Sequence, residues 1–282
     1  MSSWVTFDLD GTLMQNPFAA WIFPEITSVV REQLQLRTDI EAYDDTSFDM
    51  GKLLHAEHRK RMEAGETVAA YDWDDMVGVV LAELGVAPSI DIQVEQLVRK
   101  HAEPPTKIYL LEEGVKTVLE QLKQDGYRLA VATNGYYKYQ YPVLEALGIA
   151  AYFELIVTPE IAGGGKPDAH MLRFLRQHGT IAAHVGDRLD HDVYMANQSG
   201  AASILVNRKL PQELHQLAPE QRVHEQIFLP LCSQQLQREC QSLHRELFGD
   251  DECIVLPEQI RPDFVIHSIM ELPACLAALA AR

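Results

Sequence analysis

The chain has 282 residues, of which 47% are hydrophobic and 23% charged, an ordinary composition for a globular protein with room for two domains. Its 24 Lys and Arg against 41 Asp and Glu give a formal net charge of −17, which argues against nucleic acid as a partner. The sequence contains neither an apolar run of about 18 residues nor a signal-peptide pattern, so we expect a cytoplasmic protein that does not bind the membrane.

Trp4–Phe7 is predicted to form the first buried strand, and a long helical stretch follows it. Residues 16–105 contain helix-like patterns and no convincing strand. We therefore predict a separate helical domain of about four helices, inserted after the first strand. The predicted helices are Trp21–Leu36, Asp49–Ala64, Asp72–Leu84 and Ile90–His101.

Residues 106–282 resume an α/β pattern and are predicted to form one domain together with residues 1–15. Helical patterns cover residues 115–126 and 167–179, and Pro167 suits the first position of the second helix. Alternation of strands and helices indicates an α/β, Rossmann-like doubly wound parallel sheet. Its further predicted strands are Arg128–Ala132, Leu155–Val157, Ile181–Val185, Ala202–Val206 and Asp263–His267.

The last two predicted strands are separated by residues 207–262, which break the alternation and are interpreted as a helical extension. Within it, residues 219–248 are rich in Gln, Glu, Arg and Leu and predict one or two helices. We prefer the interpretation that this segment covers the sheet. A subunit interface, and with it a homodimer, is the alternative.

Two carboxylates follow the first strand, in the run Asp8-Leu9-Asp10-Gly11-Thr12. Ligands of open α/β sheets bind at this end of the strands. Two acids at the end of a buried strand are costly unless a cation satisfies them. An Asx-type turn would explain one Asp before Gly but explains the pair poorly.

These residues resemble the first motif of the haloacid dehalogenase-like (HAD) hydrolase superfamily, and three later runs resemble its other motifs in the same order. Val131–Gly135 resembles the second, Gly163–Asp168 the third, and His184–Asp192 the fourth in its GDxxxxD form. Each match alone is weak, whereas the four together are specific. The resemblance covers residues 1–15, 106–206 and the final strand.

The resemblance implies a nucleophile, a proton carrier and a phosphate cradle. Asp8 would attack phosphorus and form an aspartyl-phosphate intermediate. Asp10 would protonate the leaving alcohol and then activate water. Thr133 and the backbone amide of Asn134 would bind phosphoryl oxygens, while Lys166 would offset the remaining negative charge.

The resemblance also implies a Mg²⁺ site, because Mg²⁺ prefers oxygen ligands. Its ligands would be the Asp8 carboxylate, the Asp10 backbone carbonyl and Asp187, and Asp192 would orient Lys166 or the waters on the metal. Asp190 competes with Asp192 for the place of the second acid in the fourth motif, and the spacing favours Asp192.

Two further residues of the fourth motif have more than one interpretation. Arg188 is either a solvated arginine at the rim of the site or an additional contact to phosphate or substrate. His184 lies inside a predicted strand and is interpreted as a hydrogen-bonded core residue.

The family branch that these features match has a helical cap inserted between its first and second motifs, and the expected reaction is hydrolysis of a phosphate monoester. A small phosphorylated metabolite, such as a sugar phosphate or nucleotide, is the expected partner. A 2-haloacid dehalogenase is disfavoured by Asp10, because halide displacement needs no acid for an oxygen leaving group. Phosphonatase-type chemistry and a non-catalytic binding protein of the same fold are the remaining alternatives.

Overall fold

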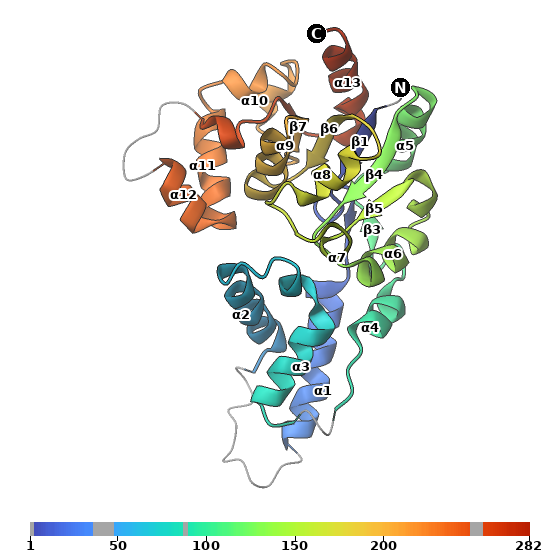
Figure 1. Cartoon of the computed structure of the whole chain (residues 1–282), viewed down its shortest axis with the longest axis vertical. Helices are drawn as coiled ribbons and strands as arrows, with labels where there is room; N and C mark the ends of the chain where they lie inside the picture. The colour runs from blue at the N-terminus through green and yellow to red at the C-terminus, as the bar shows by residue number, and fades with distance from the viewer. Residues whose placement is uncertain (1–2, 36–47, 87–89, 249–255) are drawn as a thin grey trace. The chain divides into compact units, whose positions relative to one another are not determined.

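A computed structural model describes residues 3–35, 48–86, 90–248 and 256–282, so the predicted helix end at Leu36 lies outside the described residues. The chain divides into two compact units (Figure 1). The first contains residues 1–14, 110–133 and 151–282, and the second contains residues 15–109 and 134–150. The chain crosses from one unit to the other within the short paired strands β2 (Met14–Gln15) and β3 (Tyr109–Leu110). It crosses again between residues 133 and 134 and between residues 150 and 151.

The first unit is built on a six-stranded parallel sheet in the order β5-β4-β1-β6-β7-β8, which confirms the predicted α/β fold class. All six predicted strands are present, with ends shifted by at most one residue. They are β1 (Trp4–Phe7), β4 (Arg128–Ala132), β5 (Leu155–Val157), β6 (Ile181–Gly186), β7 (Ala202–Val206) and β8 (Phe264–Ile266).

The register of the central strands explains where the motifs meet. Phe7 of β1 pairs with Val131 of β4 on one side and with Val185 of β6 on the other. Because parallel strands in this register end at the same edge, the residues that follow them converge there.

Helices cover the sheet of the first unit. Trp4, Ala130 and Ala132 point to one face and pack with buried side chains of α8 and α9. On the other face α5 packs on β4 and against α13. The helices of this unit are α5 (Val115–Gln124), α7 (Pro159–Ala162), α8 (His170–Arg176), α9 (Tyr194–Ser199), α10 (Gln212–His215), α11 (Phe228–Glu239), α12 (Gln241–Phe248) and α13 (Leu272–Ala280).

The prediction that Pro167 takes the first helical position was wrong, because α8 begins at His170. Pro167 instead follows Lys166 in the loop before the helix. The Asp168 carboxylate accepts a hydrogen bond from the His170 backbone N–H at 3.2 Å, which satisfies one of the amides at the start of the helix.

The second unit is helical, with α1 (Phe23–Gln35), α2 (Met50–Glu63), α3 (Trp73–Glu83), α4 (Val94–His101) and α6 (Tyr137–Ala146). The sequence predicts α6 as part of the α/β domain, whereas the structure groups it here. The contacts of Tyr139 give the reason. Its buried ring packs edge-on against Phe18, and its hydroxyl donates to Asp74 at 2.8 Å.

Candidate active site

Asp8 lies directly after β1 and is nearly buried, with 7% of the residue exposed. Its backbone N–H donates to the Val185 carbonyl at 2.8 Å, so the end of β6 fixes its main chain. Its carboxylate Oδ1 accepts a hydrogen bond from Lys166 Nζ at 2.5 Å. This lysine therefore reaches the first motif from the loop before α8 and orients the acid.

Asp187 is held close to Asp8 by a tight turn at Gly11. The Leu9 carbonyl accepts from the backbone N–H groups of Thr12, Leu13 and Met14, which closes the turn. Gly11 has φ +81°, and a Cβ there would lie 2.3 Å from Asp187 Oδ2. Only glycine allows both this left-handed conformation and this close approach.

Asp192 is the third acid at this edge, and three groups hold it. Its Oδ1 accepts from Lys166 Nζ at 2.7 Å and lies 3.0 Å from His184 Nε2. Its Oδ2 accepts from the Arg188 backbone N–H at 3.0 Å. A Cβ on Gly186 would lie 2.1 Å from the Asp192 Cγ, so glycine makes room for the carboxylate.

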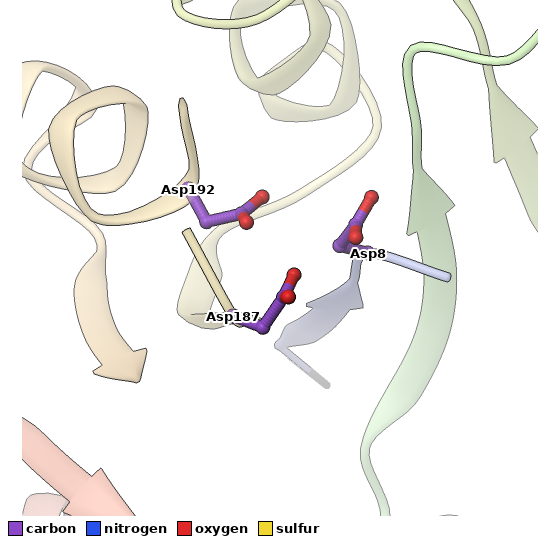
Figure 2. Close-up of side chains that lie close together, drawn as sticks. All are labelled: Asp8, Asp187 and Asp192. Atoms are coloured by element: carbon purple, nitrogen blue, oxygen red, sulfur yellow. The ribbon is translucent and has the colours of Figure 1, made fainter. Parts of the chain in front are cut away.

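Carboxylate oxygens of Asp8, Asp187 and Asp192 lie within 4.8 Å of one another, and Figure 2 shows the three side chains facing one space. Hard oxygen donors clustered in this way suit Mg²⁺. Because Asp192 is already bonded to Lys166 and His184, Asp8 and Asp187 are the carboxylates better placed to hold the metal. The carboxylate of Asp10 is not among those that form this group.

Raised pKa values indicate that the cluster lacks positive charge on the side of Asp8 and Asp187. Burial raises the pKa of Asp187 to about 8, and the negative charges of Asp8 and Asp192 add to the shift. Burial likewise raises the pKa of Asp8 to about 6, opposed by Lys166. A cation beside these two acids would reverse both shifts, which is the behaviour of a metal site.

The Lys166–Asp192 side of the cluster is by contrast compensated. Burial alone would raise the pKa of Asp192, but Lys166 and His184 hold it well below its usual range. Burial alone would lower the pKa of Lys166, yet Asp192 and Asp8 raise it above its ordinary value. Both groups are therefore ionised at neutral pH.

Asp190, the competing acid of the fourth motif, faces another partner. Arg188 donates to both of its carboxylate oxygens, at 2.9 and 2.7 Å. Burial would raise the pKa of Asp190, but His191 and Arg188 lower it. The fork of Arg188 is thus directed at Asp190, and of the two acids it is Asp192 that joins the cluster.

The second motif spans the boundary between the two compact units, which falls after Thr133. Thr133 is buried at the end of β4, and its backbone N–H donates to the Val157 carbonyl at 3.1 Å. Asn134 is the first residue of the segment grouped with the helical unit, and its side-chain amide donates to the Tyr71 hydroxyl at 2.8 Å.

Asp10 is half-buried two residues beyond Asp8, and its charge contributes to the raised pKa of Asp8.

Sequence reasoning did not assign two residues that contact the acids. Thr12 Oγ1 lies 3.4 Å from both Asp8 Oδ2 and Asp187 Oδ1. His184 is buried and hydrogen-bonded, as predicted, with Nδ1 2.8 Å from Thr6 Oγ1, but its other ring nitrogen supports Asp192. Its position inside β6, eight residues before Asp192, gave no signal of that contact.

Residues 3–200 match the family model described as haloacid dehalogenase-like hydrolase, so the chain belongs to this family of hydrolases and the resemblance of its motifs is confirmed. The probable phosphatase IndB of Dickeya dadantii is 30% identical over 214 residues, 72% of this chain and 80% of that protein. Haloacid dehalogenase-like hydrolase domain-containing protein 3 of Bos taurus is 29% identical over 167 residues. That alignment covers 57% of this chain and 64% of the bovine protein, less than two thirds of its length.

Solved structures of the same fold include both kinds of enzyme that the sequence leaves open. An HAD phosphatase from Thermococcus onnurineus superposes with a TM-score of 0.63 at 19% identity, covering 98% of each chain. A 2-haloacid dehalogenase from Pseudomonas syringae gives a TM-score of 0.60 at 21% identity, covering 99% of each. These likenesses establish the shared fold. Among the described residues, no helix has the length and apolar character needed to cross a membrane.

Proposed function

We propose that the protein is a Mg²⁺-dependent phosphatase that hydrolyses a small phosphate monoester through an aspartyl-phosphate on Asp8. The observation that carries this proposal is the environment of Asp8. Its carboxylate is paired with Lys166 on one side and lies close to Asp187, a buried acid with a raised pKa, on the other. The relatives support the reaction type. The probable phosphatase from Dickeya dadantii is one, and a glyceraldehyde 3-phosphate phosphatase of Methanopyrus kandleri, 30% identical over 142 residues, is another.

The first step is attack of Asp8 on phosphorus. The Lys166 ammonium keeps one oxygen of Asp8 in place and favours its ionised form, while Oδ2 remains on the side of Thr12 and Asp187. An Asp8 oxygen–phosphorus bond forms as the bond from phosphorus to the ester oxygen breaks. Asp10 gives its proton to the departing alkoxide, so the alcohol leaves neutral.

The second step releases phosphate. Asp10, now a carboxylate, takes a proton from water, and the water oxygen bonds to phosphorus as the Asp8–phosphorus bond breaks. Asp8 is regenerated as a carboxylate. Mg²⁺, held by Asp8, Asp187 and the Asp10 carbonyl, would supply positive charge that neutralises the phosphoryl oxygens. Thr133 and the Asn134 amide are proposed to bind those oxygens.

A dehalogenase is the second candidate, since several solved structures of this fold belong to such enzymes. Displacement of halide from carbon by Asp8 would leave an alkyl ester and release no alkoxide, so Asp10 would have no proton to deliver. Asp187 would also lack a role, because its proposed part is to hold the Mg²⁺ that neutralises the phosphoryl oxygens. The phosphatase accounts for both residues.

The test is an aryl phosphate assay with Mg²⁺, with EDTA, and with the variants Asp8→Asn and Asp10→Asn, beside an assay of halide release from 2-chloropropionate. The proposal expects phosphate release that EDTA and Asp8→Asn both abolish, and no halide. Phosphate release that survives either treatment would contradict it, and halide release would favour the dehalogenase. A panel of sugar phosphates and nucleotides would then identify the ester.

A further inference from the structure

Arg208 lies just after β7 and donates to the loop that carries the first motif. Its Nη1 donates to the Gly11 carbonyl and its Nη2 to the Thr12 carbonyl, both at 2.7 Å. These carbonyls belong to the turn between Asp8 and Met14, whose amides already close on Leu9. One planar guanidinium with two donors at fixed spacing therefore sets the orientation of two consecutive peptide groups.

The orientation of that turn decides where the acids meet. Thr12 Oγ1 sits 3.4 Å from carboxylate oxygens of both Asp8 and Asp187, and the Gly11 Cα faces the Asp187 carboxylate. A rotation of these two peptide groups would move the Thr12 hydroxyl out from between the acids. Arg208 thus acts on the acid pair through Gly11 and Thr12, without touching either carboxylate.

Arg208 is itself held in place by Glu112. Glu112 Oε1 accepts from Arg208 Nε at 3.0 Å and lies 2.8 Å from Nη2. Its other oxygen accepts from the Ser268 hydroxyl at 2.5 Å and from the Ile269 backbone N–H at 3.1 Å. The guanidinium is therefore fixed by groups that follow β3 and β8. Glu112 also balances the positive charge of Arg208, whose side chain is 26% exposed.

Gln235 on α11 holds the second acidic loop in a similar way. Its Nε2 donates to the Asp187 carbonyl at 2.8 Å and to Glu239 Oε1 at 2.8 Å. The helix cannot shift freely, because its buried residues Cys232 and Leu236 belong to one apolar cluster with Leu189 of the fourth motif. The main chain at Asp187 is thereby tied to α11.

We propose that Arg208 and Gln235, both contributed by the segment that follows β7, are positioning residues that set the spacing of Asp8 and Asp187 for a divalent cation. This proposal rests on the proposed function, because it assumes that these acids hold the metal. It gives residues 207–240 a role beyond covering the sheet. Arg208 acts through two backbone carbonyls and Gln235 through one, so neither needs to contact substrate.

The experiment measures Mn²⁺ binding by electron paramagnetic resonance, a readout independent of turnover, together with kcat and KM for an aryl phosphate. The variants are Arg208→Ala, Arg208→Lys and Gln235→Met, and the matched control is Lys209→Ala, which removes an exposed cation one residue along the chain. Loss of such indirect support typically weakens metal affinity or activity about 10- to 100-fold. We expect Mn²⁺ affinity and kcat to fall by about tenfold in the three variants, with KM and the control unchanged.

Added guanidinium at millimolar concentration should restore Mn²⁺ affinity to Arg208→Ala and leave Gln235→Met unaffected, because only the first variant leaves a guanidinium-shaped space. If Arg208→Ala does not fold, Arg208→Lys and Gln235→Met still decide the question. Wild-type Mn²⁺ affinity in folded variants, even with lowered thermal stability, would overturn the positioning role. Failure of the wild-type protein itself to bind Mn²⁺ would instead contradict the proposed function.

Discussion

Lys166 Nζ lies 2.5 Å from Oδ1 of Asp8 and 2.7 Å from Oδ1 of Asp192, and only 3% of its side chain is exposed. One buried ammonium therefore bridges two acids from different motifs and offsets part of their charge. Removal of one partner from a buried ionic group leaves uncompensated charge and is strongly destabilising.

Lys166→Met should lower the free energy of unfolding by about 3–5 kcal/mol, because it leaves Asp8 and Asp192 buried without their cation. Urea denaturation measures this. Lys138→Met is the matched control, since Lys138 pairs with Asp72 and Asp74 where 34% of its side chain is exposed. That variant should cost about 0–1 kcal/mol. Equal costs for the two lysines would contradict the buried network.

The variants Asp192→Asn and Asp190→Asn should show which of these residues serves as the second acid of the fourth motif. Asp192→Asn breaks contacts with both Lys166 and His184, so it should reduce kcat by about 10- to 100-fold and lower the melting temperature. Asp190→Asn disturbs chiefly the half-exposed Arg188 and should leave kcat within about threefold of wild type. Steady-state kinetics of the two variants decide the matter, and a reversed order would assign the role to Asp190.

The stabilisation by Mg²⁺ should increase with pH. The pKa of Asp187 is raised to about 8 and that of Asp8 to about 6, so without metal the folded state binds more protons than the unfolded state between about pH 4 and 8. Stability in EDTA should therefore fall as pH rises through this range. Mg²⁺ replaces those protons, so its effect on the melting temperature should be larger at about pH 8 than at about pH 5.5.

Differential scanning fluorimetry with Mg²⁺ or EDTA at each pH measures this dependence. Asp187→Asn is the control and should remove most of the Mg²⁺ shift. A Mg²⁺ shift that is the same at both pH values, or that survives Asp187→Asn, would show that the cation does not bind at this cluster.

Asp10→Asn should affect esters according to their leaving groups. A general acid contributes about 10²- to 10⁴-fold when the departing oxygen needs a proton. The loss of kcat/KM, which reports the steps up to departure of the alcohol, should therefore be large for an alkyl phosphate and several-fold smaller for a nitrophenyl phosphate, whose phenolate leaves readily. A uniform loss of kcat/KM across leaving groups would mean that Asp10 does not protonate the departing oxygen.

The sheet and its motif-bearing ends could be predicted from the sequence because β1, β4 and β6 are short apolar runs that lead into polar motifs. Phe7, Val131 and Val185 lie at or next to the ends of these strands, and their parallel register brings the motifs together. The contacts of Arg208 and Gln235 could not be predicted. Both depend on how residues 207–240 pack on the sheet, over sequence separations that no local pattern records.

Local signals also failed where tertiary contacts decide the outcome. Pro167 suits a helix start by its restricted φ, yet the loop that delivers Lys166 to Asp8 extends past it to His170. The grouping of α6 with the helical unit depends on Tyr139 and its bonds to Asp72 and Asp74. Four tyrosines in six residues give no indication of which one is buried.

The central claim is that Asp8 becomes covalently phosphorylated, and chemical trapping tests it most directly. Enzyme mixed with substrate and Mg²⁺ is quenched in acid, treated with borohydride, which reduces an acyl phosphate, and analysed by peptide mass spectrometry. The account predicts a reduced side chain at Asp8 that needs both substrate and Mg²⁺ and that is absent in Asp8→Asn. Turnover without any modification at Asp8, or with Asp8→Asn still active, would contradict it.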